Sequence, residues 1–383
     1  MSRFKSILFI TLIVFGSSCD ISNNDASPAD SFAKIYDDQR FEQEYYPLSI
    51  IQSSDDGYLI LSEVKNDNSL FTSAYVLKTD DAGNVEQATL LPDPYGLPVP
   101  GWSEINGEFY FVCMNTATLV GQLVAVAPDG TVGDPGDING VTYPLATAPD
   151  GNSIILLSFN NQDANSVLSI IGTAGNITQQ VEYTIGAGVD VEKPIIDHLT
   201  RNGPKLPFSV GKGGSGYYFN GLYNYTFSMV FTNFGDNPTG VCQGQLSLGG
   251  ISAAHNLSGN SYAVARYNFG ANYLNPQAQI SSNEITSSVD LGGNTFPEIE
   301  TDAIVAIKQA EASQNLVYAT HTNSRRIVLY GYSTTDGTIL GTEYIGSGNP
   351  YLFADFTFTS DGGIALLSRV ALEGRFPRIA IFK

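Results

Sequence analysis

The side chains best suited to catalysis or metal binding are few and widely separated in this chain. The three histidines are His198, His255 and His321, and none has a partner at the short spacing that metal-binding motifs require. We therefore expect no catalytic residue set, no metal site and no cofactor. A hydrolase with an acidic site that residue spacing does not reveal stays open as an alternative.

Two cysteines remain as candidates for redox chemistry. Cys113 lies in an apolar, strand-like run, and Cys242 lies near a turn. An exported chain can oxidise such a pair to a disulfide. Because the two residues belong to repeats that we do not expect to be neighbours, we predict two buried free thiols, with the disulfide as the alternative.

The third cysteine, Cys19, follows a leader-like segment. Residues 1–5 are basic, residues 7–15 are apolar except for Thr11, and residues 16–18 are small. This order is typical of a secretory signal. With a cysteine at its exit it resembles a bacterial lipoprotein signal, although Gly16 stands where that family prefers a larger aliphatic residue. The resemblance implies cleavage before Cys19 and acylation of its thiol.

The same resemblance implies how the chain is organised and where it resides. Residues 1–18 would be the signal peptide, residues 19–31 a polar, flexible tether, and residues 32–383 a single domain. The nine-residue apolar run is too short for a transmembrane helix, which needs roughly 20 residues. Asp20 and Asp25 resemble outer-leaflet sorting signals. We expect a protein anchored in the outer membrane by lipid on Cys19, with its orientation toward the cell surface left open.

Composition excludes one class of partner and favours one class of fold. Once Arg3 and Lys5 leave with the signal, 16 basic residues face 38 acidic ones, a net charge of −22. Such a surface repels nucleic acid, so we expect no nucleic-acid partner. The 39 glycines, 21 tyrosines and 21 phenylalanines suit many short strands joined by tight turns.

A strand–turn–strand pattern recurs along the chain. Its first turns centre on Gly57, Gly107, Gly151, Gly216, Asn260, Asn315 and Gly362, at steps of 44–65 residues. A period of this length with four strands in each unit predicts an all-β fold, a seven-bladed β-propeller of four-stranded antiparallel blades. The turn motifs over residues 48–91, 143–186 and 353–383 resemble repeats of bacterial secreted propeller proteins and lipoproteins.

The two ends of the domain predict how the ring closes. The last unit, residues 353–383, supplies only three strands before the chain stops. Residues 33–37, before the first complete unit, resemble the outer strands of other units. We predict that this N-terminal strand completes the C-terminal blade, because closure removes an open sheet edge.

Two turns partly match the Asp-box of sialidase-like propellers. They are Ser53-x-Asp55-x-Gly57 and Thr359-x-Asp361-x-Gly363. Both lie in the first hairpin of a unit rather than between its third and fourth strands, and neither continues to a tryptophan. We interpret them as ordinary Asp-Gly turns.

The middle of the domain is rich in tyrosine and asparagine and fits the repeat poorly. Five tyrosines form the candidate binding face: Tyr217, Tyr223, Tyr225, Tyr267 and Tyr273. Tyrosine offers rigid contact area together with a hydrogen-bonding group. The alternative is that these rings only pack the core and pair across strands.

These observations lead to a functional hypothesis with two rivals. We expect a non-enzymatic platform for protein interaction, docked on an outer-membrane or envelope protein complex. A glycan-binding surface lipoprotein is the first alternative, motivated by the tyrosine-rich segment. The hydrolase is the second.

Overall fold

The computed structural model describes residues 31–36, 43–65, 69–202, 205–214, 216–246 and 248–383. The predicted signal peptide, Cys19 and the tether up to residue 30 lie outside the described residues, as does Asp37. Within the described ranges, no helix is both long enough and apolar enough to cross a membrane.

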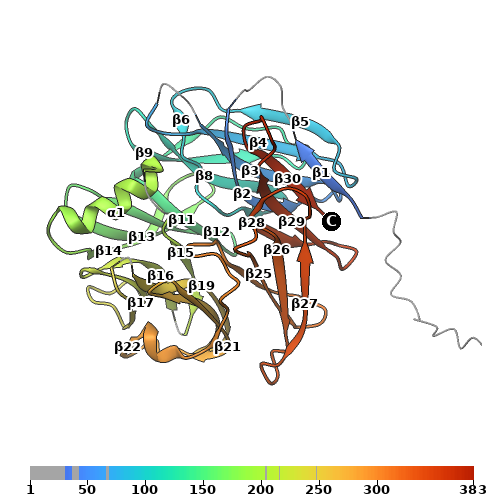
Figure 1. Ribbon diagram of the computed structural model, residues 1–383. Helices are drawn as coiled ribbons and strands as arrows, with labels where there is room; N and C mark the ends of the chain where they lie inside the picture. Colours follow the sequence, from blue (N-terminus) through green and yellow to red (C-terminus); the bar gives the residue numbers. More distant parts are fainter. Residues whose placement is uncertain (1–30, 37–42, 66–68, 203–204, 215, 247) are drawn as a thin grey trace, which may run out of the picture.

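The described strands form six hydrogen-bonded sheets arranged as a ring (Figure 1). The largest has nine strands: β2 (Tyr45–Gln52), β3 (Tyr58–Val64), β4 (Ser73–Thr79), β5 (Val85–Leu90), β6 (Tyr95–Gly96), β7 (Ser103–Ile105), β8 (Glu108–Asn115), β9 (Val120–Val126) and β10 (Gly136–Thr142). The next has four: β11 (Pro144–Asp150), β12 (Ser153–Asn160), β13 (Asn165–Gly172) and β14 (Ile177–Thr184).

Four further sheets complete the ring. One contains β15 (Ser209–Gly213), β16 (Gly216–Tyr223), β17 (Thr226–Thr232), β18 (Gly240–Gln243) and β22 (Ile285–Ser287). Another contains β19 (Gly249–Ser258), β20 (Ser261–Asn268), β21 (Ala271–Gln279) and β23 (Asn294–Thr295). The last two contain β24 (Ala306–Gln309), β25 (Leu316–His321), β26 (Ile327–Tyr332) and β27 (Ile339–Ile345), and β28 (Tyr351–Phe358), β29 (Ile364–Val370), β30 (Arg378–Phe382) and β1 (Ala33–Tyr36).

The strands are arranged as in a β-propeller. First strands of neighbouring sheets pack against one another, as β2 does with β28 and β11 with β15, so they surround the middle of the ring. The core lies between neighbouring sheets. One buried cluster joins Tyr58 and Leu77 to Leu367 and Ile381, which belong to the two ends of the chain. The predicted all-β propeller fold is therefore confirmed.

The predicted count of seven separate four-stranded blades is wrong. The structure has five blades of four or five strands, and the nine strands β2–β10 form one continuous sheet. The short strand β6 causes this continuity, because Gly96 pairs with Ser73 of β4 and with Met114 of β8. The blades are also not uniformly antiparallel, since β22 adds to β18 in parallel, with Val241 opposite Ile285.

Ring closure takes place as predicted. β1 pairs antiparallel with β30, from Ala33 opposite Phe382 to Tyr36 opposite Ile379. Phe32 and Lys383 exchange two backbone hydrogen bonds, of 3.1 and 2.9 Å. The edge of the C-terminal blade is therefore covered by the N-terminal strand, and the two ends of the domain lie side by side (Figure 1).

The turns follow from their residues. Asn106 and Gly107, between β7 and β8, both have positive φ angles, 56° and 82°, as a two-residue type I′ hairpin turn requires. Asparagine tolerates this region and glycine enters it without strain. The repeated Asn-Gly and Asp-Gly signals are thus the local cause of the hairpins.

One helix was not expected from the sequence. α1 (Val189–Thr200) lies between β14 and β15 and buries Val191, Ile195 and Leu199, which share one helix face at a spacing of four residues. Asp190 and Glu192 in its first turn favour the helix dipole. Pro194 inside the helix breaks the usual helical pattern, which is why this short segment reads as a loop.

The closure can be tested with proline substitutions in β1. Because Phe32 and Lys383 form a hydrogen-bonded pair, alternation makes Lys34 and Ile381 the next such pair, and the N–H of Ile35 points away from β30. We expect Lys34→Pro to lower the free energy of unfolding by about 1–2 kcal/mol relative to Ile35→Pro, by removal of a ladder hydrogen bond. Urea unfolding of both variants measures this. Equal stabilities would contradict the closure.

Candidate functional site

The ring has two faces that differ in the kind of loop they carry. We name one the connection face. It consists of the turns between second and third strands together with the connections between sheets. Backbone hydrogen bonds join these loops around the ring: Tyr225 N–H donates to Ile185 O (2.8 Å), Phe269 N–H to Leu248 O (2.8 Å), Asn323 N–H to Glu298 O (2.8 Å) and Ala371 N–H to Pro350 O (3.1 Å).

The opposite face, which we name the hairpin face, carries the turns between first and second strands and between third and fourth strands. It also holds the two partial Asp-box turns. In the first, Asp55 accepts from Gly57 N–H (3.1 Å) and from Lys78 Nζ (2.8 Å). In the second, Asp361 accepts from Gly363 N–H (3.1 Å). Both carboxylates thus stabilise their own turns, as the turn interpretation expects.

Charge is distributed unequally between the two faces. The arginines that the structure describes all lie at or near the connection face: Arg201, Arg266, Arg325, Arg326, Arg369, Arg375 and Arg378. Aspartates cluster in the hairpin-face turns: Asp55, Asp56, Asp80, Asp81, Asp129, Asp150, Asp336 and Asp361. An acidic chain therefore presents most of its guanidinium groups on one side.

An aromatic ring held between two guanidinium groups lies on the connection face. Tyr46, on β2, has the Arg201 guanidinium 3.8 Å from its ring centroid and that of Arg369 4.2 Å away. Glu44 accepts hydrogen bonds from the Tyr46 hydroxyl and from Arg369 Nη2, the latter at 3.2 Å. Cation–π contacts and charged hydrogen bonds thus join β2, β29 and the connection that follows α1.

A buried carboxylate adds to this contact. Glu63, on β3, accepts from Arg201 Nε (2.5 Å) and from the Thr72 hydroxyl (2.8 Å). Burial opposes its charge, yet Arg201 and Lys205 together hold the pKa of Glu63 down at about 2. The pKa of Lys205 is also lowered, to about 8, because burial outweighs the attraction of Glu63, whose oxygen lies 3.8 Å away. Arg201 is therefore the main partner of Glu63.

This central cluster of Glu44, Tyr46, Glu63, Arg201 and Arg369 is mainly structural. Its charged groups are engaged with one another, so it holds the connection after α1 against the nine-stranded sheet. Beside the cluster, the half-buried amine of Lys205 donates to the His198 carbonyl (2.7 Å).

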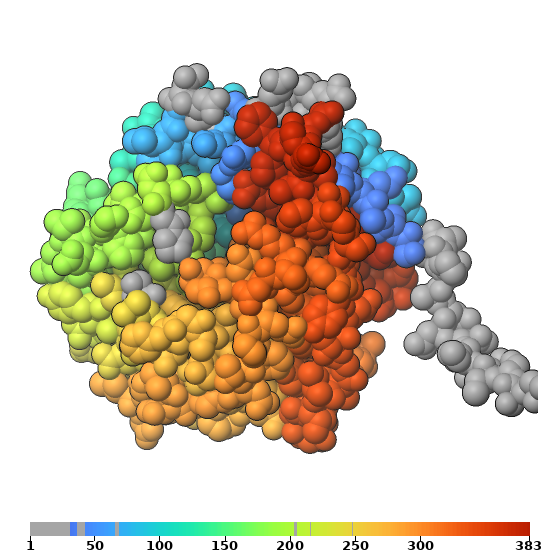
Figure 2. Space-filling model, in the orientation of Figure 1, coloured from blue at the N-terminus to red at the C-terminus, as the bar shows by residue number. Residues whose placement is uncertain are grey.

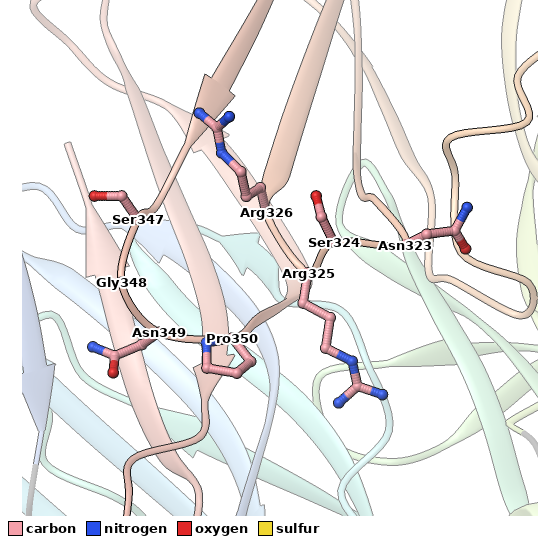
Figure 3. Close-up of a pocket in the computed structure, with 8 residues that line it drawn as sticks. All are labelled: Asn323, Ser324, Arg325, Arg326, Ser347, Gly348, Asn349 and Pro350. Atoms are coloured by element: carbon pink, nitrogen blue, oxygen red, sulfur yellow. The ribbon is translucent and has the colours of Figure 1, made fainter.

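A polar groove lies farther out on the connection face. It encloses about 650 Å³ between the β25–β26 turn, with Arg325 and Arg326, and the β27–β28 connection, residues 347–350. Figure 3 shows the two guanidinium groups pointing in opposite directions from the turn. Both groups also have partners within the protein: Arg325 Nη2 donates to Glu300 (3.3 Å), and Arg326 donates to the carbonyls of Tyr344 (3.3 Å) and Gly346 (3.2 Å). Because they point apart, they do not enclose one small anion.

The connection face also exposes large apolar side chains. Six of them stand on six different loops of this face: Leu70, Tyr225, Leu248, Phe269, Ile304 and Phe376. Phe269 is the most exposed aromatic of the set, at 67%. Figure 2 shows this side of the molecule, with segments from the blue, green, orange and red parts of the chain arranged around its middle.

The five tyrosines predicted as a binding face do not form one group. Tyr223, Tyr267 and Tyr273 lie near the connection-face ends of their strands, and Tyr225 lies in the turn between β16 and β17 on the same face. Tyr217 lies at the other end of β16 and donates to Asp150 (2.8 Å). Tyr225 is 51% exposed and the other four are half-buried. The ring of Tyr273 is covered by Arg266, 3.9 Å from its centroid.

The three histidines occupy separate structural positions. His198 lies in α1 and its Nδ1 accepts from Leu206 N–H (2.9 Å), and burial keeps its pKa well below the usual value. His321 accepts from Phe353 N–H (3.2 Å), and burial lowers its pKa to about 4 against the pull of Glu300. His255 lies on β19. In the described part of the chain, no three histidine, cysteine or acidic side chains gather as metal ligands.

The two cysteines of the domain are both buried and free, as predicted. Burial raises the pKa of Cys113 to about 12 and that of Cys242 to about 11. Thiols in this state are poor nucleophiles at neutral pH.

The arginine-rich face was missed by the sequence reasoning. The arginines are scattered over nearly 180 positions and form no motif. What these arginines share is their position within the repeat, because most of them lie near the turn between the second and third strands of a unit. Aligning charged residues by their place in each repeat would have located the face.

Comparisons with known proteins support the fold. The chain matches no protein-family model, and the search of curated proteins finds no match. Among solved structures it is similar to the β-propeller domain of the trilobed protease from Pyrococcus furiosus, at 8% identity and a TM-score of 0.49, covering 90% of this chain and 94% of that one.

Two other solved chains are similar over almost their whole length. One is a catalytically inactive virginiamycin B lyase from Staphylococcus aureus, at 14% identity and a TM-score of 0.48, covering 92% of this chain and 99% of that one. The other belongs to a mitotic checkpoint complex, at 9% identity and a TM-score of 0.51, covering 99% of both chains. Likeness at this identity concerns the fold alone.

The low pKa of Glu63 predicts a pH dependence of stability. The folded-state pKa, about 2, is below the ordinary value of 4.5, so the stabilisation is complete above about pH 4.5 and is lost as pH falls through 2. A pKa shift of this size corresponds to about 3 kcal/mol of folding free energy. When the free energy of unfolding in urea is measured between pH 5 and 2, it should fall less steeply in Glu63→Gln than in the unchanged protein. The exposed Glu343→Gln is the control, and an unchanged slope in Glu63→Gln would refute the pairing.

Proposed function

We propose that this protein is a lipid-anchored propeller of the bacterial envelope that acts as a non-enzymatic platform for protein interaction. The leader that precedes Cys19 supports the anchor, and the polar residues 20–31 supply the tether. The partner is an outer-membrane or envelope protein that docks on the connection face.

The observation that carries this proposal is the combination of exposed apolar side chains and arginines on one face. Aromatic residues and arginine are enriched at protein interfaces and dominate their binding energy. Phe269 and Tyr225 provide the exposed rings. Beside the groove, Arg325 stays about half exposed although it pairs with Glu300, and it is the guanidinium group that a partner would contact there. The partner surface that fits is apolar with acidic groups around it.

The place where the tether joins the domain is compatible with this docking. Phe32, the last residue before β1, exchanges backbone hydrogen bonds with Lys383 and contacts the region of Gly83, in a hairpin-face turn. The described part of the domain therefore begins at the hairpin side, opposite the connection face.

The docking face is tested by co-purification from detergent-solubilised membranes, followed by measurement of the dissociation constant for the partner found. Phe269→Ala and Arg325→Ala should each weaken binding about 30-fold, equivalent to about 2 kcal/mol for an interface anchor. Val85→Ala, at an exposed apolar side chain of the hairpin face, is the matched control.

Two results would contradict the platform. One is equal binding by all three variants. The other is specific binding on a glycan array without any co-purifying envelope protein, which would favour the glycan-binding alternative.

The anchor is tested separately. Cys19→Ala should leave the full-length precursor uncleaved and abolish retention of acylated protein in the membrane fraction, because the acylated thiol is then missing. Gel mobility and membrane fractionation report both effects. A variant still processed after residue 18 and still found with membranes would rule out lipidation at this residue.

A further inference from the structure

The strand β27 is unusually exposed for a strand of this ring. It is the outermost strand of its sheet, and among the described strands it pairs only with β26 (Figure 1). Six of its seven residues are exposed, including the apolar Ile339, Leu340 and Tyr344. The outer side of β18, by contrast, is covered by β22. A long edge with exposed apolar side chains is a template for pairing with another strand.

The hydrogen-bond pattern shows which backbone groups of β27 face outward. Thr322 N–H donates to the Arg326 carbonyl (2.9 Å), so the backbone of Arg326 faces β25. By alternation Ile327 faces β27, where it pairs with Ile345. The residues of β27 that bond inward are then 345, 343 and 341, and Thr342 and Tyr344 present their N–H and C=O groups outward.

Part of this edge is already occupied by a side chain. Arg326 reaches the outward carbonyls of Tyr344 and Gly346, at 3.3 and 3.2 Å. A carbonyl oxygen has two lone pairs, so Tyr344 can accept a second donor. Thr342 remains the central outward-facing residue of the strand.

The sequence of β27 is complementary to itself when two copies run antiparallel about Thr342. Gly341 then faces Glu343, and Thr342 faces Thr342 of the other copy. The register between β26 and β27 shifts at Leu340, because Gly331 pairs with Gly341 and Tyr332 with Ile339. Beyond this bulge, Ile339 and Leu340 lie near Ile345 and Tyr344 of the other copy as side-chain neighbours rather than as a regular ladder. Apolar, aromatic–aliphatic and Thr–Thr pairs across strands are favourable. The only charged residue of the strand, Glu343, meets a glycine, so no like charges are opposed.

We propose that β27 pairs with β27 of a second copy of this chain, which joins two rings by a continuous sheet about a twofold axis through Thr342. The interface is isologous, as in most homodimers. A single strand pair buries less than a standard interface, so the dimer is expected to be weak, with a dissociation constant on the order of micromolar or above.

The register gives a direct cross-linking test on the full chain. Facing Thr342 residues in a hydrogen-bonded pair lie about 5.5 Å apart between Cα atoms, within disulfide range. Thr342→Cys should therefore form disulfide-linked dimers under mild oxidation. In Glu343→Cys the two cysteines would be offset along the strands, roughly 8 Å apart, and should cross-link far less. Gln179→Cys, on the exposed outer strand β14, controls for random collision.

A second measurement keeps the proposal independent of cysteine chemistry. Thr342→Pro removes only an outward N–H, so the propeller should stay folded while the dimer dissociation constant, measured by analytical ultracentrifugation, rises about tenfold or more. Ile35→Pro is the matched control at another outer strand. Equal cross-linking of the residue 342 and 343 variants, or a wild-type chain that stays monomeric at all concentrations, would overturn the proposal.

Discussion

The pairing of β1 with β30 is the interaction on which the rest of the ring depends. Without it the last sheet would end in an open edge at β30, and the direct packing of β28 and β29 against β2 would be the remaining join between the first and last sheets. With it, the first and last sheets share one buried cluster. The central contact on the connection face lies at the same junction, because Tyr46 comes from β2 and Arg369 from β29. The join between the first and last sheets thus brings together side chains that lie more than 300 residues apart in sequence.

The second organising feature is that the described arginines gather on one face of the ring, while many turn aspartates lie on the other. Aspartates stabilise turns by accepting from backbone N–H groups, so the hairpin face becomes acidic as a consequence of its turn chemistry. Arginines lie on the other side, where some lock loops together and Arg325 and Arg326 lie beside an open groove. The connection face also carries acidic residues, among them Asp163, Glu298, Glu300 and Glu373, so a partner there meets charges of both signs.

The sequence was informative wherever a local rule decides the structure. Asn106-Gly107 and Asp361-Gly362 predicted hairpins because few residues enter these turns without strain, and the missing fourth strand after residue 383 predicted the closure. The predicted number of blades was wrong because a two-residue strand, Tyr95–Gly96, joins two sets of strands into one sheet. No periodic sequence pattern marks such a short strand. The helix α1 was not predicted because Pro194 interrupts its helical sequence pattern. Of the predicted tyrosines, only Tyr225 is largely exposed, since exposure depends on packing by distant residues such as Arg266 over Tyr273.

The claim that the connection face carries the function is tested most directly by site-specific photo-cross-linking in intact cells. A photoreactive amino acid replaces Phe269 on the connection face or Val85 on the hairpin face, both of which are more than half exposed. The account predicts one discrete protein adduct from position 269 and none from position 85. Adducts from position 85 alone, or the same adducts from both positions, would contradict it.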